Sequence, residues 1–161
     1  MIKYNLDKKY TDVILPACAA VSCSEFESRF KKVDQRELLE VCRKNEIASI
    51  VGHYLAEHVG AGGLLPEWAE EVEQMAAKTG GYLKELSRVA GIFEIEGIAL
   101  IGLKNCGIAA NLIRIPALFP MGDVDVLVAR EDFPRAHELL EAEGYELKAP
   151  NKYKKADFNE G

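Results

Sequence analysis

Two acidic side chains, Asp123 and Asp125, alternate with valines in the stretch GDVDVLV. Because successive side chains on a β-strand point to opposite faces, both carboxylates would project from one face, about 6 to 7 Å apart. With an effective dielectric constant of about 20, two negative charges at that distance repel by about 2 kcal/mol. A divalent cation reverses the sign of this interaction, and hard oxygen ligands suit Mg²⁺. The pattern therefore predicts a metal site at Asp123 and Asp125.

A candidate phosphate site precedes these acids in the chain. The apolar run IALIGL ends at Lys104 and Asn105, which lead into the helix-compatible stretch CGIAANLI. A strand that runs into a helix presents backbone N–H groups and the positive end of the helix dipole, which favours a phosphate. Lys104 would add a full charge, Asn105 is a candidate N-cap, and Gly122 suits a close approach of backbone to a nucleotide. The competing interpretations are a solvated lysine at a strand end and a turn glycine.

The elements that would position these residues alternate in type after Gly97. The pattern predicts a strand from Ile98, a helix after Asn105, a strand over Val124–Val128, a helix from Glu131 to Gly144 and a third strand over Tyr145–Lys148. This order is typical of an α/β unit.

The first half of the chain has helical periodicity instead. Asp34 is placed as an N-cap, a second helix is expected over Ile47–Val59, and the longest periodic segment runs from Leu64 to Glu96. Gly80 and Gly81 fall in the middle of that segment, where a kink or a break is expected. The sequence thus predicts a helical region over residues 1–96, followed by an α/β core over residues 97–161, packed together as one compact unit.

Composition places the protein in a broad class. The 161 residues are 48% hydrophobic and 29% charged, with a net charge of -6, which is ordinary for a globular domain and argues against a broad nucleic-acid footprint. The four cysteines lack paired CxxC spacing and are interpreted as reduced thiols. The N-terminus is too polar for a signal peptide, and no apolar run approaches the ~20 residues of a membrane span. We therefore expect a cytoplasmic protein without membrane association.

Three motifs together carry a family resemblance: LIGLKNCGIAANLI, FPMGDVDVLV and REDFPRAHELLEAEGYEL. Over about residues 98–147 they resemble the uncharacterised nucleotidyltransferase family of the polymerase-β superfamily. The resemblance implies an α+β fold with a small mixed sheet. It also implies catalytic, magnesium-binding roles for Asp123 and Asp125, and places Lys104, Asn105 and Gly122 near the nucleotide phosphates.

The chain departs from the family pattern at three points. Asn105 and Phe119 stand where the family commonly has glycine and arginine. No later apolar strand carries the third carboxylate of such transferases, and Asp157 and Glu160 are the only late candidates. Either the chain is a truncated piece of a longer protein, or the site is incomplete.

Two functions remain open at this point. The first is a transferase that uses Mg²⁺ or Mn²⁺ to move a nucleoside monophosphate from ATP or another nucleoside triphosphate to an unknown acceptor, which could be a protein, an RNA or a small molecule. The second is a catalytically inactive nucleotide-binding or protein-interaction module, in which the long helix provides the partner surface. The sequence leaves base preference and homo-oligomerisation undecided.

Overall fold

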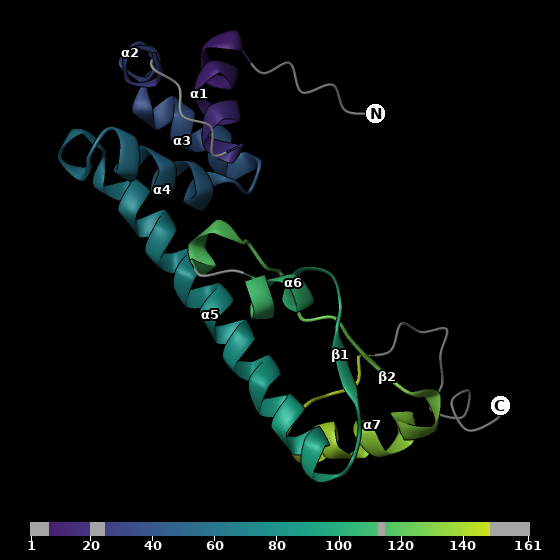
Figure 1. Cartoon of the computed structure of the whole chain (residues 1–161). Coiled ribbons are helices and arrows are strands. Elements are labelled where there is room, and N and C mark those ends of the chain that lie inside the picture. Colours follow the sequence, from purple (N-terminus) through teal and green to yellow (C-terminus); the bar gives the residue numbers. More distant parts are fainter. Residues whose placement is uncertain (1–6, 20–24, 113–114, 149–161) are drawn as a thin grey trace. The chain divides into compact units, whose positions relative to one another are not determined.

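The computed structural model describes residues 7–19, 25–112 and 115–148, which are mostly helical (Figure 1). By its contacts the chain divides into two units. The first comprises Met1–Gly81 and Leu112–Gly122, and the second comprises Tyr82–Asn111 and Asp123–Gly161. One long helix, α5 (Pro66–Ile95), contributes its first part to the first unit and the rest to the second.

The first unit is helical in its described part. It contains α1 (Lys8–Cys18), α2 (Phe26–Phe30), α3 (Gln35–Lys44), α4 (Ala48–His58), 3-10 turns at Ala61–Gly63 and Pro116–Leu118, and the beginning of α5. The Asp34 carboxylate accepts hydrogen bonds from the N–H groups of Arg36 and Glu37, both at 2.9 Å, so its predicted N-cap role is confirmed. Apolar side chains from α1, α2, α3 and α4 form the core with Trp68 of α5, which is 1% exposed.

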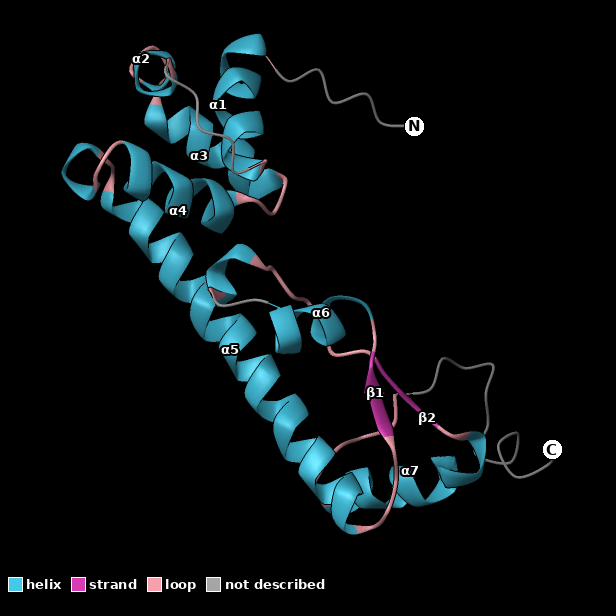
Figure 2. Ribbon diagram, in the orientation of Figure 1, coloured by secondary structure: helices cyan, strands magenta, loops and turns pink. Residues whose placement is uncertain are grey.

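The second unit joins a two-stranded sheet to helices. It contains the end of α5, β1 (Leu100–Gly102), α6 (Lys104–Leu112) up to Asn111, β2 (Val126–Val128), a 3-10 turn at Arg130–Asp132, and α7 (Phe133–Ala142). The two strands are antiparallel, with Ile101 opposite Leu127 (Figure 2). Leu100 and Val128 pack on a cluster that includes Phe93 of α5 and Ala136 of α7. The sheet is therefore held on the helices through these residues.

The structure bears out the α+β class and corrects several boundaries. β2 begins at Val126, so Asp123 and Asp125 lie in the segment that leads into the strand and not on the strand itself. The prediction of a break at Gly80 and Gly81 is wrong, since α5 runs through both glycines for 30 residues without interruption.

The predicted third strand over Tyr145–Lys148 is also wrong. These residues form no strand, and the Tyr145 N–H donates to the Leu140 carbonyl at 3.0 Å, close behind the end of α7. The sheet of the described residues is antiparallel, and the mixed sheet, the truncation and the domain division at residues 96 and 97 stay predictions. Asp157 and Glu160 lie outside the described residues.

Candidate functional site

The turn from β1 into α6 is built on a close approach of two backbone segments. An ideal Cβ added at Gly107 would lie 2.4 Å from the carbonyl oxygen of Gly102 and 3.0 Å from its carbonyl carbon. No side chain larger than that of glycine fits there without moving the backbone. The first turn of α6 is thereby fixed against the end of β1.

A second set of contacts fixes the backbone of Asp125. The Leu103 N–H donates to the Asp125 carbonyl at 2.9 Å, which continues the pairing of β1 with β2 by one hydrogen bond. Cys106, which is 1% exposed, places its thiol 2.9 Å from the carbonyls of both Leu103 and Asp125. Because a thiol has one proton, it donates to one carbonyl at a time. The sequence alone gives no sign of this role for Cys106, since a cysteine in a short helix is also an ordinary small core residue.

At this turn, Lys104 forms an ion pair with Asp125. The Lys104 Nζ lies 2.8 Å from Asp125 Oδ2, and 73% of the lysine side chain and 34% of the aspartate side chain are exposed. The hydrogen bond to Asp125 is the main cause that raises the pKa of Lys104, and the charges of Asp125 and Asp123 add to it. Lys104 is therefore protonated at neutral pH and faces the acidic pair.

The structure thus pairs two of the predicted site residues, Lys104 and Asp125, and the charge of Asp123 also acts on the lysine. The N-cap prediction for Asn105 is wrong, because the Gly107 N–H already donates to the Leu103 carbonyl at 3.3 Å and Asn105 lies inside the first turn of α6. Gly122 belongs to the first unit, where it lines a cavity of about 290 Å³. Its predicted place near a nucleotide stays a prediction.

The sequence of the chain matches the model of one known protein family. The sequence model of a family described as uncharacterised nucleotidyltransferases matches residues 31–160. The chain belongs to this nucleotidyltransferase family. Membership supports nucleotidyl transfer as the general activity and a nucleotide as substrate. Neither a curated protein nor a solved structure matches the chain.

The chain has an apolar groove beside Lys104. The groove has a volume of about 670 Å³ and is lined by α5, β1 and the start of α6. Its lining residues are Leu86, Ser87, Ala90, Leu100, Ile101, Gly102, Leu103, Lys104, Gly107 and Ile108. Lys104 is the one charged residue among them. The groove could hold the apolar part of a ligand whose anionic part lies at the lysine.

The residue types of the acidic pair fit a divalent cation that shares its coordination with a substrate. Mg²⁺ in proteins is usually held by one or two carboxylates together with water and substrate phosphates. Asp123 and Asp125 supply two carboxylates, and Asp123 is exposed. Within the described ranges, no three His, Cys, Asp or Glu side chains gather as a metal-binding group. The two aspartates therefore suit a metal ion that arrives with phosphates.

None of the helices that the structure describes combines the length and the apolar character that a membrane crossing demands.

Proposed function

We propose that the chain binds a nucleoside triphosphate with Mg²⁺ or Mn²⁺ at Lys104, Asp123 and Asp125, and transfers the nucleoside monophosphate to an acceptor. The observation that carries this proposal is the 2.8 Å contact between Lys104 Nζ and Asp125 Oδ2 at the turn from β1 into α6. Lysine commonly binds phosphates and aspartate commonly binds metal ions. Both residues lie within residues 31–160, which the family model matches.

Each residue has a distinct role in this proposal. Asp123 and Asp125 would hold the cation, which when bound neutralises the phosphate charge and activates the α-phosphorus. Lys104 would bind a phosphate oxygen as a point charge. The backbone N–H of Asn105, in the first turn of α6, lies at the positive end of the helix, where anions are favoured.

The chemical step is an in-line displacement. A hydroxyl oxygen of the acceptor forms a bond to the α-phosphorus, the bond from that phosphorus to the bridging oxygen breaks, and pyrophosphate leaves with the electron pair. The proton of the hydroxyl passes to solvent. In such a reaction the protein contributes mostly positioning and electrostatic stabilisation, which charged residues on a fixed turn supply.

A second candidate function is nucleotide binding without transfer. It is favoured by the carboxylates of Asp123 and Asp125, because one or two protein carboxylates with substrate phosphates are the usual ligands of Mg²⁺. Two carboxylates suffice to hold a metal–nucleotide complex, whereas a two-metal mechanism needs more ligands.

A thermal-shift experiment tests the binding that both functions share. We expect Mg²⁺ with at least one of ATP, CTP, GTP and UTP to raise the melting temperature of the wild type and to leave that of Asp125→Asn unchanged. Glu94→Gln is the matched control, since it removes one exposed carboxylate from α5 in the same unit and should keep the wild-type shift. A wild type that responds to none of the four nucleotides, with Mg²⁺ or Mn²⁺, would refute the proposal. Pyrophosphate release by the binding-competent wild type then separates transfer from binding alone.

A further inference from the structure

Lys104 is held against Asp125 by its backbone as well as by its charge. Its φ angle is 48°, in the left-handed region that disfavours residues with a Cβ. It is also the residue that directly follows Leu103, whose N–H is bonded to the Asp125 carbonyl. The turn thus starts the lysine side chain close to the aspartate.

The backbone of Asp125 is also restrained. The Leu103 N–H donates to its carbonyl and ties its backbone to the end of β1, and the Cys106 thiol of α6 lies 2.9 Å from the same carbonyl. The carboxylate and the ammonium group thus start from neighbouring, hydrogen-bonded backbone, which favours their pairing. Any second cation that binds Asp125 therefore meets an ammonium group at 2.8 Å from Oδ2.

We infer that Lys104 is a resident counter-ion of Asp125 that competes with the divalent cation, and that the phosphates of the incoming nucleotide relieve this competition by taking over the lysine. The inference rests on the proposed function, because it requires that Asp123 and Asp125 bind the cation. A bare metal ion would bind weakly, since it approaches a carboxylate that is already neutralised. A metal–nucleotide complex binds better, because it supplies a new anionic partner for Lys104, and metal and nucleotide affinities are coupled by this exchange.

Electron paramagnetic resonance of free Mn²⁺ measures this coupling on the full chain without a catalytic step. The titration is run without nucleotide and with a non-hydrolysable ATP analogue, or with the analogue of whichever nucleotide gives the thermal shift. Mn²⁺ bound by the analogue alone is measured without protein and subtracted. For the wild type we expect the analogue to tighten Mn²⁺ binding about tenfold or more, within the usual range for coupled sites. Lys104→Gln should tighten the binding of bare Mn²⁺ by about tenfold and lose most of the effect of the analogue.

Two further variants serve as controls. Lys104→Arg keeps the charge and should keep the weak binding of bare Mn²⁺. Lys84→Gln removes an exposed lysine from α5 in the same unit, and should leave both affinities at the wild-type values. It therefore controls for the change in net charge.

The outcomes separate this inference from the proposed function. If Mn²⁺ binds and its affinity is the same in the wild type and Lys104→Gln, or if the analogue does not tighten Mn²⁺ binding to the wild type, the counter-ion role is overturned while the metal site stands. If Mn²⁺ binds neither protein with or without the analogue, the proposed function fails and the inference fails with it. Should Lys104→Gln not fold, Lys104→Met, which replaces the ammonium group by a neutral side chain, gives the same test.

Discussion

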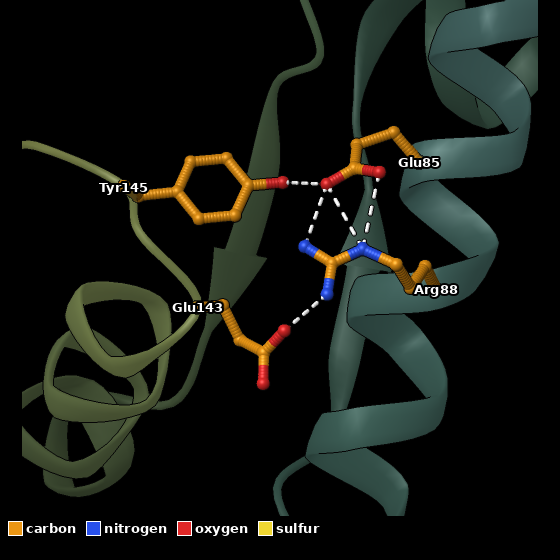
Figure 3. Close-up of polar contacts among 4 residues, drawn as sticks. All are labelled: Glu85, Arg88, Glu143 and Tyr145. Carbon is orange, nitrogen blue, oxygen red and sulfur yellow. Dashed lines mark hydrogen bonds and ion pairs between the residues drawn. The ribbon is translucent and has the colours of Figure 1, made fainter.

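Four charged or polar side chains of the second unit form a network that links α5 to the chain behind α7 (Figure 3). Arg88 and Glu85 lie on the same face of α5, with Arg88 Nη2 at 2.8 Å from Glu85 Oε1. Arg88 also pairs with Glu143, and the Tyr145 hydroxyl donates to Glu85. Glu85 is thereby the acceptor for donors from two parts of the chain, and its ionisation affects both.

The first prediction concerns the acid stability that Glu85 provides. The hydrogen bonds from Arg88, and next those from Tyr145, lower the pKa of Glu85 from 4.5 to about 2. Because the pKa in the folded state lies below that in the unfolded state, the stabilisation is present above about pH 4.5 and is lost as the pH falls towards 2. We expect the melting temperature, followed by circular dichroism, to fall over this interval more steeply for the wild type than for Glu85→Gln.

The matched control for this prediction is Glu94→Gln, another exposed glutamate of α5 in the same unit. It should retain the steep wild-type slope. Parallel slopes for the wild type and Glu85→Gln would contradict an ionised Glu85 that stabilises the fold.

At the scale of residues, the sequence indicated side chains whose local pattern is unusual and missed those whose partners are remote. Asp123, Asp125 and Lys104 were singled out by charge, by spacing and by the apolar runs beside them. Tyr145 was misassigned to a strand, because the feature that determines its place is a bond to Glu85, 60 residues away in the sequence. The alternation of apolar and polar residues around Tyr145 does not indicate that partner. The local sequence likewise does not indicate the contact between Cys106 and Asp125, which lie 19 residues apart.

At the scale of elements, the second prediction concerns the close approach of β1 and α6. Gly107→Ala would place a methyl group 2.4 Å from the Gly102 carbonyl oxygen, and neither backbone can yield without moving its element. Alanine gains up to about 1 kcal/mol of helix propensity, but the strain of overpacking against backbone is larger, so we expect a net loss of about 2 kcal/mol in the free energy of unfolding. Urea denaturation followed by circular dichroism measures this loss.

Gly91→Ala in α5 is the control for helix propensity alone, because a Cβ there meets no other atom within 4 Å. It should be neutral or stabilising by up to about 1 kcal/mol. If both alanine variants were equally stable, the close approach of Gly107 to Gly102 would not constrain the fold.

The N-terminus of α3 gives a third prediction. Asp34→Ala removes the acceptor for the N–H groups of Arg36 and Glu37, and should cost about 1 kcal/mol in urea denaturation. Asp34→Asn keeps a side-chain oxygen at the cap and should cost much less. An asparagine variant as unstable as the alanine variant would show that the charge, and not the cap, matters at this position.

Helices whose apolar residues recur at helical spacing over many residues were predictable from the sequence. Short elements were predictable only in part. The predicted helix over Ile47–Val59 corresponds to α4 (Ala48–His58), and the periodic segment over Leu64–Glu96 corresponds to α5. Two glycines in α5 cost at most about 1 kcal/mol each, which is small beside the contacts that the helix makes along its length. β2 has three residues, so its start depends on pairing with β1, and the sequence of β2 alone could not show that Asp125 precedes the ladder.

Two of the apolar clusters among the residues that the structure describes draw side chains from one helix, α5. The first includes Leu55 and Trp68, and the second includes Phe93, with Leu100 and Val128 packed on it. Trp68 is the single tryptophan, so its emission reports on the first cluster alone. Each cluster can therefore be perturbed and observed by itself, with α5 as the element common to both.

The fourth prediction is that the two clusters differ in their response to cavity-forming substitutions. Phe93→Ala removes a side chain that is 1% exposed and should lower the free energy of unfolding of its cluster by about 3 to 5 kcal/mol. Amide exchange in β1, β2 and α7 should become faster, while the urea midpoint of the Trp68 emission should move much less. Leu55→Ala removes a fully buried side chain and should give the reverse pattern, with a large shift of the Trp68 midpoint. Hydrogen exchange by mass spectrometry, resolved by peptide, measures both responses. If amide exchange and the Trp68 midpoint changed equally in both variants, α5 would couple the two clusters into one cooperative unit. The groove and the ion pair beside β1 would then unfold together with the helical core.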